Sequence, residues 1–338
     1  MIPYALIKPA LFALEPEVAH AATFAALDRA HACGLTRLTT PTLPVKPVDA
    51  MGIRFPNPVG LAAGLDKNAA HVDGLATFGF GFIEVGTVTP RAQPGNPKPR
   101  MFRLTEHEAL INRLGFNNEG LPGLLKNVAR IKWKGILGIN IGKNFDTPNE
   151  RAHEDYAMCL RTVYPHAHYI TVNISSPNTK NLRDLQSEEA LKVLMQTVKQ
   201  EQLIMADRTG RYVPIAVKIA PDMSDEMTTA TARALVALKA DGIIATNTTI
   251  ERANVAGHAH ASEAGGLSGA PVRVRSDQVL ALVVKAVDGA VPVIGVGGIL
   301  SPNDAVRKLN LGAALVQIYT GLIYKGPELV AQTVRAIP

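Results

Sequence analysis

Hydrophobic residues in this chain gather in short runs that end in glycine or a polar residue and are followed by a helical pattern. Eight such runs are PVGLAAG (58–64), FIEVGTV (82–88), ILGINIG (136–142), YITVNIS (169–175), PIAVKIA (214–220), GIIATNT (242–248), PVIGVGG (292–298) and LVQIYTG (315–321). Between them, apolar residues recur at three- and four-residue spacing, as in 187–204, and Ser224 and Ser301 stand where helix caps are expected. Runs that are apolar on both faces and joined by helices indicate a parallel sheet covered by helices.

Eight strand–helix units predict an α/β fold, a (β/α)8 TIM barrel with a small N-terminal helical extension. An open doubly wound sheet is the alternative, but no GxGxxG opens the first unit. The first residues fit no barrel unit and read as two short helices broken near Glu15 and Pro16. We therefore expect an N-terminal helical segment over 1–45 and the barrel over 46–338.

The ends of the eight runs carry polar groups: GLDK, GTVT, NIGKN, NISSPN, KIAPD, TNTT, GGI and YTG. In a barrel these ends meet at one face, where such enzymes keep their sites. Gly297 and Gly298 precede a helix that starts near Ser301, and free N–H groups at a helix start suit a phosphate. Tyr319 and Thr320 would add donors beside it.

Lysines and asparagines at these ends indicate the chemistry of the ligand. Lys67 and Lys218 are costly to bury unpaired, so they favour an anionic partner. The side chains of Asn140, Asn173 and Asn247 offer donors and acceptors, which suit a planar ring with alternating N–H and C=O groups. A flavin and a pyrimidine both have such a ring.

Composition narrows the class of protein. The 338 residues are 47% hydrophobic and carry a net charge of +6, which favours an anionic ligand or an anionic membrane surface. With 5% aromatic residues and no basic stripe among them, nucleic acid is not an expected partner. No metal is expected, because Cys33 and Cys159 are far apart and no histidine pair stands at a strand end. The N-terminus does not read as a signal peptide, and no apolar run approaches the ~20 residues of a spanning helix.

Several motifs together resemble one family. AAGLDKN, GTVTPRAQPGNPKPRMFRL, INRLGFNNEG, VNISSPNT, VKIAPD, ATNTT, GGLSGAP, GVGGI and QIYTGLIYKGP are similar to the class 2 dihydroorotate dehydrogenases, which are membrane-associated and quinone-dependent. The resemblance runs from about Tyr4 to the last predicted helix. It implies a barrel that holds FMN and oxidises dihydroorotate to orotate in pyrimidine (UMP) biosynthesis, with a membrane quinone as electron acceptor.

The resemblance also implies roles for single residues. The expected FMN contacts are Ala63, Gly64, Leu65, Asp66, Lys67, Thr87, Asn140, Asn173, Lys218, Thr246, Gly269, Gly298, Tyr319 and Thr320. The expected substrate contacts are Lys67, Asn112, Arg113, Leu114, Gly115, Phe116, Asn173, Asn178, Asn247 and Thr248. Ser176 is the expected catalytic base, with Thr179 as a proton relay and Phe116 excluding solvent.

One feature narrows the resemblance to a subclass, and another departs from the family pattern. The soluble relatives use cysteine as the base, whereas this chain has Ser176, which selects the quinone-dependent class. After SPNT the family often has Pro-Gly, whereas this chain has Lys180 and Asn181. Asparagine tolerates the left-handed conformation that glycine supplies, so we expect the turn to be kept.

The resemblance assigns the N-terminal segment to the membrane surface and to quinone access. Lys8, Arg29 and Arg37 would face lipid phosphates, and His20, Arg103 and Tyr319 would line a tunnel to the flavin. The expected location is that of a peripheral protein on the cytoplasmic face of a bacterial inner membrane. A simple cap over one end of the barrel is the alternative.

Two other functions remain open from the residues alone. One is a phosphate-binding barrel without redox chemistry, such as a sugar-phosphate isomerase or lyase, and the other is a barrel that binds without catalysis. The colour of a bound flavin distinguishes the first from a dehydrogenase, and bleaching of that colour by substrate excludes the second.

Overall fold

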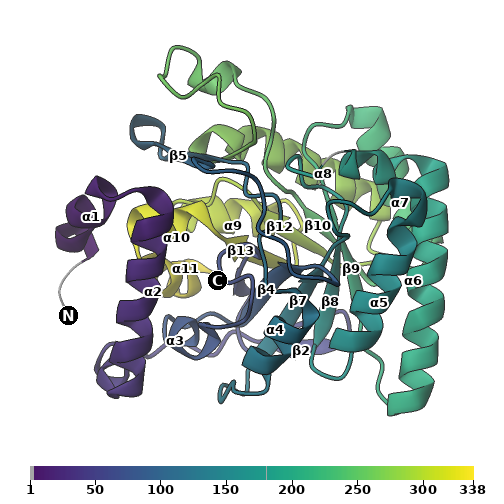
Figure 1. The fold of residues 1–338 in the computed structure, drawn as a ribbon, viewed down its shortest axis with the longest axis horizontal. Coiled ribbons are helices and arrows are strands. Elements are labelled where there is room, and N and C mark those ends of the chain that lie inside the picture. The colour runs from purple at the N-terminus through teal and green to yellow at the C-terminus, as the bar shows by residue number, and fades with distance from the viewer. Residues whose placement is uncertain (1–3, 180) are drawn as a thin grey trace.

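The structure is a computed structural model that describes residues 4–179 and 181–338. Eight parallel strands close into a barrel in the order β10, β12, β13, β3, β4, β7, β8 and β9, which confirms the predicted TIM barrel (Figure 1). The strands are β3 (Val59–Leu61), β4 (Phe82–Val88), β7 (Ile136–Ile141), β8 (Tyr169–Asn173), β9 (Ile215–Ile219), β10 (Gly242–Ala245), β12 (Val293–Val296) and β13 (Leu315–Ile318). Each lies inside one of the eight predicted runs.

Helices surround the barrel and cover the outer faces of its strands (Figure 1). They are α3 (Val72–Ala76), α4 (Gly120–Val128), α5 (Ala152–Val163), α6 (Glu188–Thr209), α7 (Asp225–Ala237), α8 (Arg273–Val287), α9 (Pro302–Asn310), α10 (Thr320–Lys325) and α11 (Glu328–Ala336). Ser224 and Ser301 cap α7 and α9 through their side chains, as expected from the sequence. Apolar residues of strands and helices form one continuous core between the two layers.

Short 3₁₀ helices interrupt the connecting segments. They are η1 (Leu35–Leu38), η2 (Thr105–His107), η3 (Asn149–Arg151), η4 (Leu182–Gln186), η5 (Ala253–Val255) and η6 (Ala270–Val272). Of these, η4 matters most for the site, because it follows the SPNT motif directly. Its preceding residue, Asn181, has φ 55°, so the expected left-handed turn is present. Lys180 lies outside the described residues.

The amino end of the barrel is closed by aromatic side chains. The hairpin of β1 (Val48–Ala50) and β2 (Ile53–Phe55) brings Phe55 against Phe82 at the start of β4, with ring centroids 5.1 Å apart. Phe82 in turn lies 6.2 Å from Tyr169 at the start of β8. All three side chains are fully buried. A ligand therefore has to approach from the carboxyl end.

A three-stranded antiparallel sheet lies at the carboxyl end, and the sequence did not predict it. It consists of β11 (Gly266–Gly269), β6 (Ala109–Asn112) and β5 (Met101–Leu104), in that order. Each strand has only four residues, and GLSG in β11 carries no strand pattern of its own. The pairing joins segments about 150 positions apart, such as Asn112 with Gly266. Local patterns cannot reveal such a contact.

The N-terminal segment forms two helices, α1 (Tyr4–Ala13) and α2 (Pro16–Ala32), as predicted. They stand beside the barrel near α3 and α10 (Figure 1). Phe24 of α2 stacks on the ring of His71, and Asp28 bonds the same ring at 2.7 Å. Glu17 of α2 pairs with Arg100 at 2.9 Å. The segment is thus attached to the barrel by aromatic and ionic contacts.

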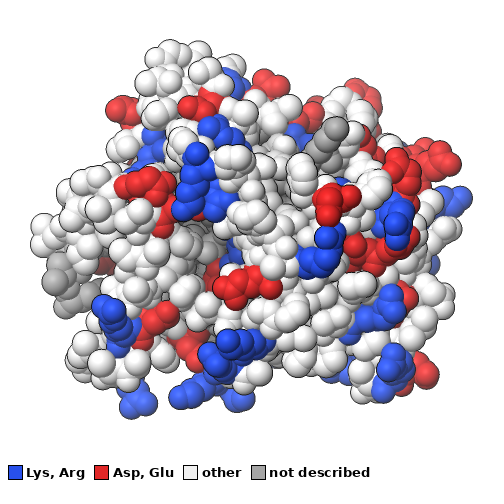
Figure 2. All heavy atoms as spheres, in the orientation of Figure 1, with Lys and Arg blue, Asp and Glu red and all other residues white. Residues whose placement is uncertain are grey.

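Large hydrophobic side chains remain exposed on this N-terminal segment: Leu6, Ile7, Leu14, Val18, Leu35, Leu38 and Val45. On the face in Figure 2 the area over α1 and α2 is mostly uncharged, whereas acidic and basic atoms are interspersed elsewhere. Within the part of the chain that the structure describes, no helix is long and apolar enough to cross a membrane.

Candidate active site

A pocket opens at the carboxyl end of the barrel, where the polar strand ends were predicted to meet. Of the residues singled out from the sequence, those that line it are Ala63, Gly64, Lys67, Thr87, Asn112, Leu114, Gly115, Phe116, Asn173, Ser176, Asn178, Lys218, Thr246, Asn247, Thr248, Gly269, Gly298, Tyr319 and Thr320. Seven of the eight strands contribute to this set through their ends or the loops that follow them. The predicted convergence is therefore found.

Four of the predicted residues place their side chains elsewhere. Leu65 lines a separate apolar channel, and Asn140 lies beneath the pocket. Asp66 accepts hydrogen bonds from the backbone of Ala70 and His71, and burial raises the pKa of its carboxyl. Arg113 turns away from the pocket toward Glu263, at 2.6 Å.

Two lysines give the pocket its positive charge. Lys218 is buried at the end of β9, and within the described residues its ammonium has no hydrogen-bond acceptor. Burial lowers the pKa of Lys218, and Glu84 opposes that shift. Lys67 donates to the carbonyl of Gly64 at 2.9 Å. Its burial, with Arg100 nearby, lowers the pKa of Lys67 to about 8. Both groups suit an anionic or electron-rich ligand.

Amide side chains form a connected layer around the pocket. Asn173 donates to the hydroxyl of Thr87 at 3.0 Å and accepts from the hydroxyl of Ser175 at 3.0 Å. Asn247 donates to the same serine hydroxyl at 3.0 Å. On the opposite wall, Asn178 donates to the side-chain oxygen of Asn112 at 3.1 Å. The side-chain oxygen of Asn178 is buried and has no partner among the residues that the structure describes, so it can accept from a donor on a ligand.

The two serines of NISSPN point in different directions. The hydroxyl of Ser175 is held by the asparagine layer, whereas Ser176 lines the pocket. Among the described residues, the hydroxyl of Ser176 accepts only the backbone N–H of Asn178, at 3.2 Å. Ser176 is therefore the serine whose hydroxyl can meet a ligand.

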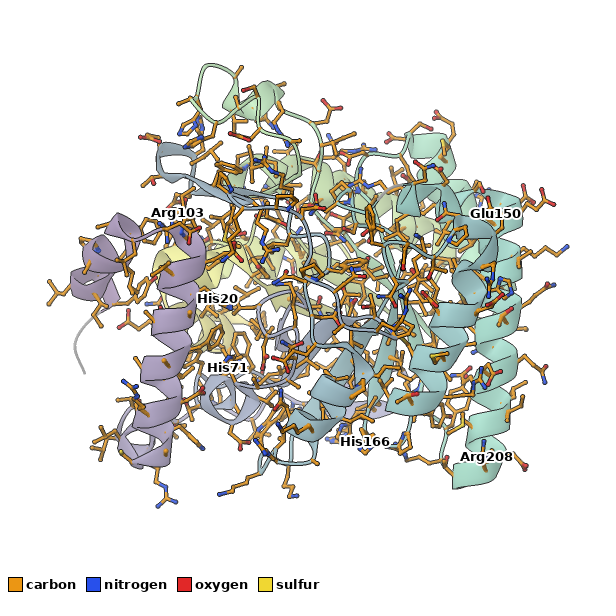
Figure 3. All side chains as sticks on the ribbon, in the orientation of Figure 1. His20, His71, Arg103, Glu150, His166 and Arg208 are labelled. Atoms are coloured by element: carbon orange, nitrogen blue, oxygen red, sulfur yellow. The ribbon has the colours of Figure 1, made fainter. Side chains whose placement is uncertain are left out.

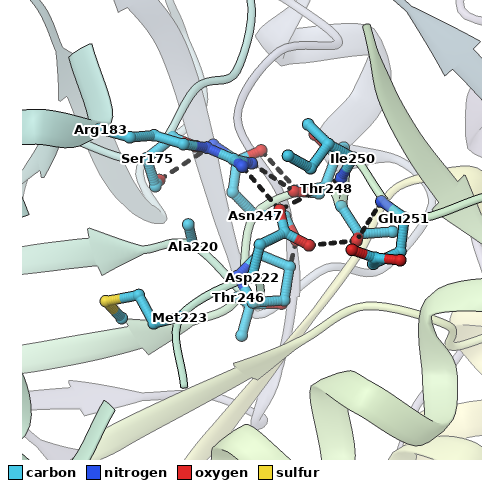
Figure 4. Close-up of polar contacts among 12 residues, drawn as sticks. Ser175, Arg183, Ala220, Asp222, Met223, Thr246, Asn247, Thr248, Ile250 and Glu251 are labelled. Atoms are coloured by element: carbon cyan, nitrogen blue, oxygen red, sulfur yellow. Dashed lines mark hydrogen bonds and ion pairs between the residues drawn. The ribbon is translucent and has the colours of Figure 1, made fainter. Parts of the chain in front are cut away.

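Arg183 fastens the segment that follows this loop. Its guanidinium donates to the carbonyl of Ser175 at 3.0 Å, to the carboxylate of Asp222 at 2.6 Å and to the carbonyl of Thr248 at 2.9 Å (Figure 4). Asp222 also accepts the hydroxyl of Thr249. One side chain thus joins the ends of β8, β9 and β10, and it fixes the base of the SPNT loop. The sequence analysis did not single out Arg183.

The helix start near Ser301 offers fewer free N–H groups than the predicted phosphate site would use. The N–H groups of Leu300 and Ser301 donate to the carboxylate of Asp304 at 3.1 and 2.9 Å. A capping box at α9 uses them, since Asp304 supplies the acceptor. The turn at Gly297 and Gly298 remains, with φ of 114° and 70°.

One backbone N–H group of that turn is unused. The N–H of Gly298 donates to no acceptor within the described residues. A Cβ on Gly298 would lie 2.3 Å from that of Arg273, so only glycine fits. The start of α10, at Thr320 and Gly321, lines the pocket beside it.

A second, apolar channel lies between the N-terminal helices and the barrel. It is lined by residues of α1 and α2 and, from the barrel side, by Leu65, Leu75, Arg103, Tyr319 and Leu322. Tyr319 lines both this channel and the polar pocket. Burial raises the pKa of Tyr319 to about 12, so its hydroxyl stays neutral.

Two polar residues stand in this channel. Burial, and then the charge of Lys67, lowers the pKa of His20 to about 4. Arg103 donates to the carbonyls of Phe12 and Leu14 at 3.2 and 2.7 Å, so it binds the end of α1 to β5. Figure 3 shows His20 and Arg103 on the α2 side, and His166 at the far, amino end of the barrel.

Comparison with known proteins decides the family. A family model described as dihydroorotate dehydrogenase matches residues 46–338. The chain belongs to the dihydroorotate dehydrogenase family. Curated relatives named dihydroorotate dehydrogenase (quinone) include one from Chromobacterium violaceum, 62% identical over 98% of this chain and 97% of the relative. Another, from Methylobacillus flagellatus, is 58% identical over 99% of both chains.

Solved structures agree with this membership. A crystal structure of DHODH from Eimeria tenella in complex with ferulenol superposes with a TM-score of 0.84. It is 35% identical and covers 94% of this chain and 89% of its own. A ligand-free form from the same organism gives a TM-score of 0.83 at 36% identity, covering 94% of this chain and 93% of its own.

Dihydroorotate dehydrogenases are flavoenzymes, and the pocket of this family member fits a flavin. The unused N–H of Gly298 suits a phosphate. The ammonium of Lys218, which has no partner among the described residues, suits an electron-rich ring, and Gly64 would let the backbone approach that ring closely. A Cβ on Gly64 would lie 3.3 Å from the ring of Tyr319. Within the described residues, no group of histidine, cysteine, aspartate and glutamate side chains is arranged to hold a metal ion.

Sequence reasoning missed the residues beneath the pocket. Glu84 and Gln317 are buried inside the barrel, on β4 and β13. The signal was present, because each is a polar residue in the middle of an apolar run, FIEVGTV and LVQIYTG. A charged group at such a place is costly unless it has partners.

Proposed function

We propose that this protein catalyses the FMN-dependent oxidation of (S)-dihydroorotate to orotate, with a membrane quinone as electron acceptor, in pyrimidine biosynthesis. One observation carries the proposal: a polar pocket of lysine and asparagine meets an apolar channel at a single side chain, Tyr319. A polar anion and a water-insoluble acceptor can thus reach one cofactor by separate approaches. The relatives named dihydroorotate dehydrogenase (quinone) support the same reaction.

The cofactor of this proposal is FMN. When bound, FMN supplies the two-electron redox chemistry that links the substrate to the quinone. The turn at Gly298, with the start of α10 at Thr320, would hold its phosphate. Lys218 would lie against its ring, where a buried cation favours the electron-rich form. The remaining contacts would come from Ala63, Gly64, Lys67, Thr87, Asn173, Thr246, Gly269 and Tyr319, all of which line the pocket.

The substrate would lie between the asparagine layer and the SPNT loop. Asn173, Asn247 and Thr248 would hold the pyrimidine ring from one side, with Asn112 and Asn178 on the other. Leu114, Gly115 and Phe116 close the wall between them. Lys67 would pair with the carboxylate, because its ammonium lines the same pocket.

Ser176 would accept the proton from the carbon acid of the substrate. Its hydroxyl lines the pocket and, within 4–179 and 181–338, is engaged only by one backbone N–H. A neutral hydroxyl is a weak base, so it has to pass a proton onward as it accepts one. Thr179, buried three residues later, would receive that proton with ordered water.

The N-terminal segment, residues 1–45, would serve the quinone. Its apolar channel reaches Tyr319 past Arg103 and His20, and the neutral imidazole of His20 suits an apolar passage. Its exposed hydrophobic side chains and the basic residues Lys8, Arg29 and Arg37 would lie against an anionic membrane surface. The protein would therefore be peripheral, on the cytoplasmic face of a bacterial inner membrane.

An anaerobic titration tests the reaction. The purified protein should be yellow, and dihydroorotate should bleach the flavin absorbance in stoichiometric amount, with orotate as product. Addition of a long-tailed quinone should restore the colour. A colourless holoprotein, or a flavin that dihydroorotate leaves oxidised, would overturn the proposal.

A further inference from the structure

Glu84 places a carboxylate inside the barrel, beneath the polar pocket. It is fully buried on β4, and its two oxygens accept three hydrogen bonds. Asn140 donates to it at 2.8 Å, the hydroxyl of Tyr169 at 2.9 Å and the amide of Gln317 at 2.7 Å. All three contacts are donors, which is the environment of an ionised carboxylate.

From this carboxylate a chain of hydrogen bonds runs to the pocket wall. The NH2 group of Asn140 donates to Glu84. The side-chain oxygen of Asn140 therefore faces Thr87 and accepts the Thr87 hydroxyl at 2.6 Å. The oxygen of Thr87 in turn accepts the NH2 of Asn173 at 3.0 Å. The side-chain oxygen of Asn173 then faces Ser175, whose hydroxyl and backbone N–H donate to it at 3.0 and 3.2 Å.

The last hydrogen bonds of the chain fix the orientation of the side-chain amide of Asn247. The hydroxyl of Ser175 has given its proton to Asn173, so its oxygen accepts the NH2 of Asn247 at 3.0 Å. The side-chain oxygen of Asn247 is occupied by the N–H of Thr248 at 2.8 Å. Every bond in the chain therefore has one direction, which leads from the backbone N–H groups of Ser175 and Thr248, which only donate, to the carboxylate of Glu84, which only accepts.

The chain determines what the pocket offers to a ligand. The oxygens of Asn173 and Asn247 face the donors of Ser175 and Thr248, so the NH2 group of each amide is the group that it turns to the other side. A reversed amide would present an oxygen instead and would repel a ring carbonyl. The links from Glu84 to Ser175 are buried, so water cannot replace a mismatched partner among them.

We propose that Glu84 is a positioning residue for substrate binding. Its carboxylate orients the amides of Asn173 and Asn247, through Asn140 and Thr87, so that both turn N–H donors toward the ring carbonyl oxygens of the bound pyrimidine. This inference rests on the proposed function, since it takes the ligand to be dihydroorotate or orotate. Glu84 touches neither ligand nor reacting atoms and acts only through the chain.

A purely structural role for Glu84 is the competing explanation. The carboxylate also balances the charge of Lys218, so its loss could disturb the flavin rather than the amides. Thr87 separates the two explanations, because it lies in the chain but carries no charge. A valine at this position keeps the shape of threonine and removes both hydrogen bonds.

The experiment measures orotate affinity of the flavin-loaded enzyme from the change in flavin absorbance. The variants are Glu84→Gln, Thr87→Val and Thr87→Ser. A matched control is Tyr169→Phe, which removes a donor from the same carboxylate on the side away from the chain. Flavin stoichiometry and melting temperature are recorded for each variant, because a change confined to ligand affinity separates positioning from folding.

Glu84→Gln should weaken orotate binding by about 10- to 100-fold, as expected for buried amides that no longer have one fixed orientation. The Km for dihydroorotate should rise in proportion, more than kcat falls. Thr87→Val should reproduce the loss with the Glu84 charge intact. Thr87→Ser keeps the hydroxyl and should bind orotate more tightly than Thr87→Val does. Tyr169→Phe should stay within about threefold of the unmodified protein.

Unchanged orotate affinity in Thr87→Val would overturn the proposal, even if Glu84→Gln fails to fold. An equal loss in Tyr169→Phe would also overturn it, because general damage to the barrel interior would then explain the effect. If the unmodified protein binds no orotate, the proposed function itself is wrong. These failures are distinguishable, since the first two require a wild-type enzyme that binds orotate.

Discussion

Arg183 donates to the carboxylate of Asp222 at 2.6 Å, and this ion pair closes the base of the loop that carries Ser176. Both side chains are mostly buried, at 19% and 10% exposure, so the pair is shielded from solvent. The same guanidinium holds two backbone carbonyls, at Ser175 and Thr248. The guanidinium therefore holds the chain in place at Ser175, directly before Ser176, as well as at Arg183 itself.

Loss of these Arg183 contacts should slow catalysis. Arg183→Gln should lower the rate of flavin reduction by about 10- to 100-fold, because a small misplacement of a catalytic group has effects of this size. Arg183→Lys should recover part of the rate, since an ammonium can pair with Asp222 but cannot reach all three acceptors. Anaerobic stopped-flow absorbance measures the rate. Arg151→Gln is the control, because Arg151 forms an exposed pair with Glu154.

Ser176 should behave as the base. Ser176→Ala should slow flavin reduction by about 10²- to 10⁴-fold, the usual effect of losing a general base, while orotate affinity stays close to normal. Ser176→Cys should keep part of the activity with a shifted pH profile. The control is Ser187→Ala, since the hydroxyl of Ser187 caps no backbone N–H of α6. A normal single-turnover rate in Ser176→Ala would remove the serine from the mechanism.

Lys67 should give substrate binding a pH dependence. The pKa of Lys67 is lowered to about 8, so its side chain carries a positive charge below that pH and loses the charge as pH rises through it. Affinity for the anionic orotate should therefore be constant below about pH 8 and fall about tenfold per pH unit above it. Lys67→Arg should keep its charge and show no such fall. A parallel decline in both proteins would assign the titration to another group.

The exposed apolar side chains of α1 should bind membrane. Leu6→Glu should weaken binding to anionic liposomes and lower the rate with a long-tailed quinone, while the rate with a small soluble dye stays unchanged. The matched control is Leu203→Glu, which alters a similarly exposed leucine on α6 (57% against 71% exposure). Sedimentation with liposomes measures the binding.

Removal of the segment before Lys46 should have a larger effect of the same kind. Quinone reduction should fall with liposome binding, whereas dye reduction by dihydroorotate should persist. The bared surface around His71 and Leu75 can promote aggregation, so the preparation has to be checked by gel filtration. Equal retention of both activities with normal liposome binding would show that residues 1–45 only cap the barrel.

The barrel could be predicted because its strands are defined locally. PIAVKIA and GIIATNT each contain a complete buried strand, and Ser224 and Ser301 mark helix starts by chemistry that acts over three residues. The pocket followed from topology, since a barrel brings all the strand ends together.

What could not be predicted depends on distant partners. The contact of Arg183 with Asp222 and the pairing of β6 with β11 each join segments that carry no matching local pattern. The occupied N–H groups at the start of α9 are a different case, because Asp304 lies only three residues after Ser301 and their capping box is a local pattern that was missed. Glu84 was visible as a charge in an apolar run, but its partners are on three other strands.

Tyr319 lines both the polar pocket and the apolar channel, which share no other lining residue within the part of the chain that the structure describes. In the proposed reaction, a compound that fills the apolar channel would block the electron acceptor without displacing any group that holds the pyrimidine. Raising the dihydroorotate concentration would not relieve such a blockade. Selective inhibitors can therefore be built against the apolar channel alone, with no need to imitate a charged metabolite.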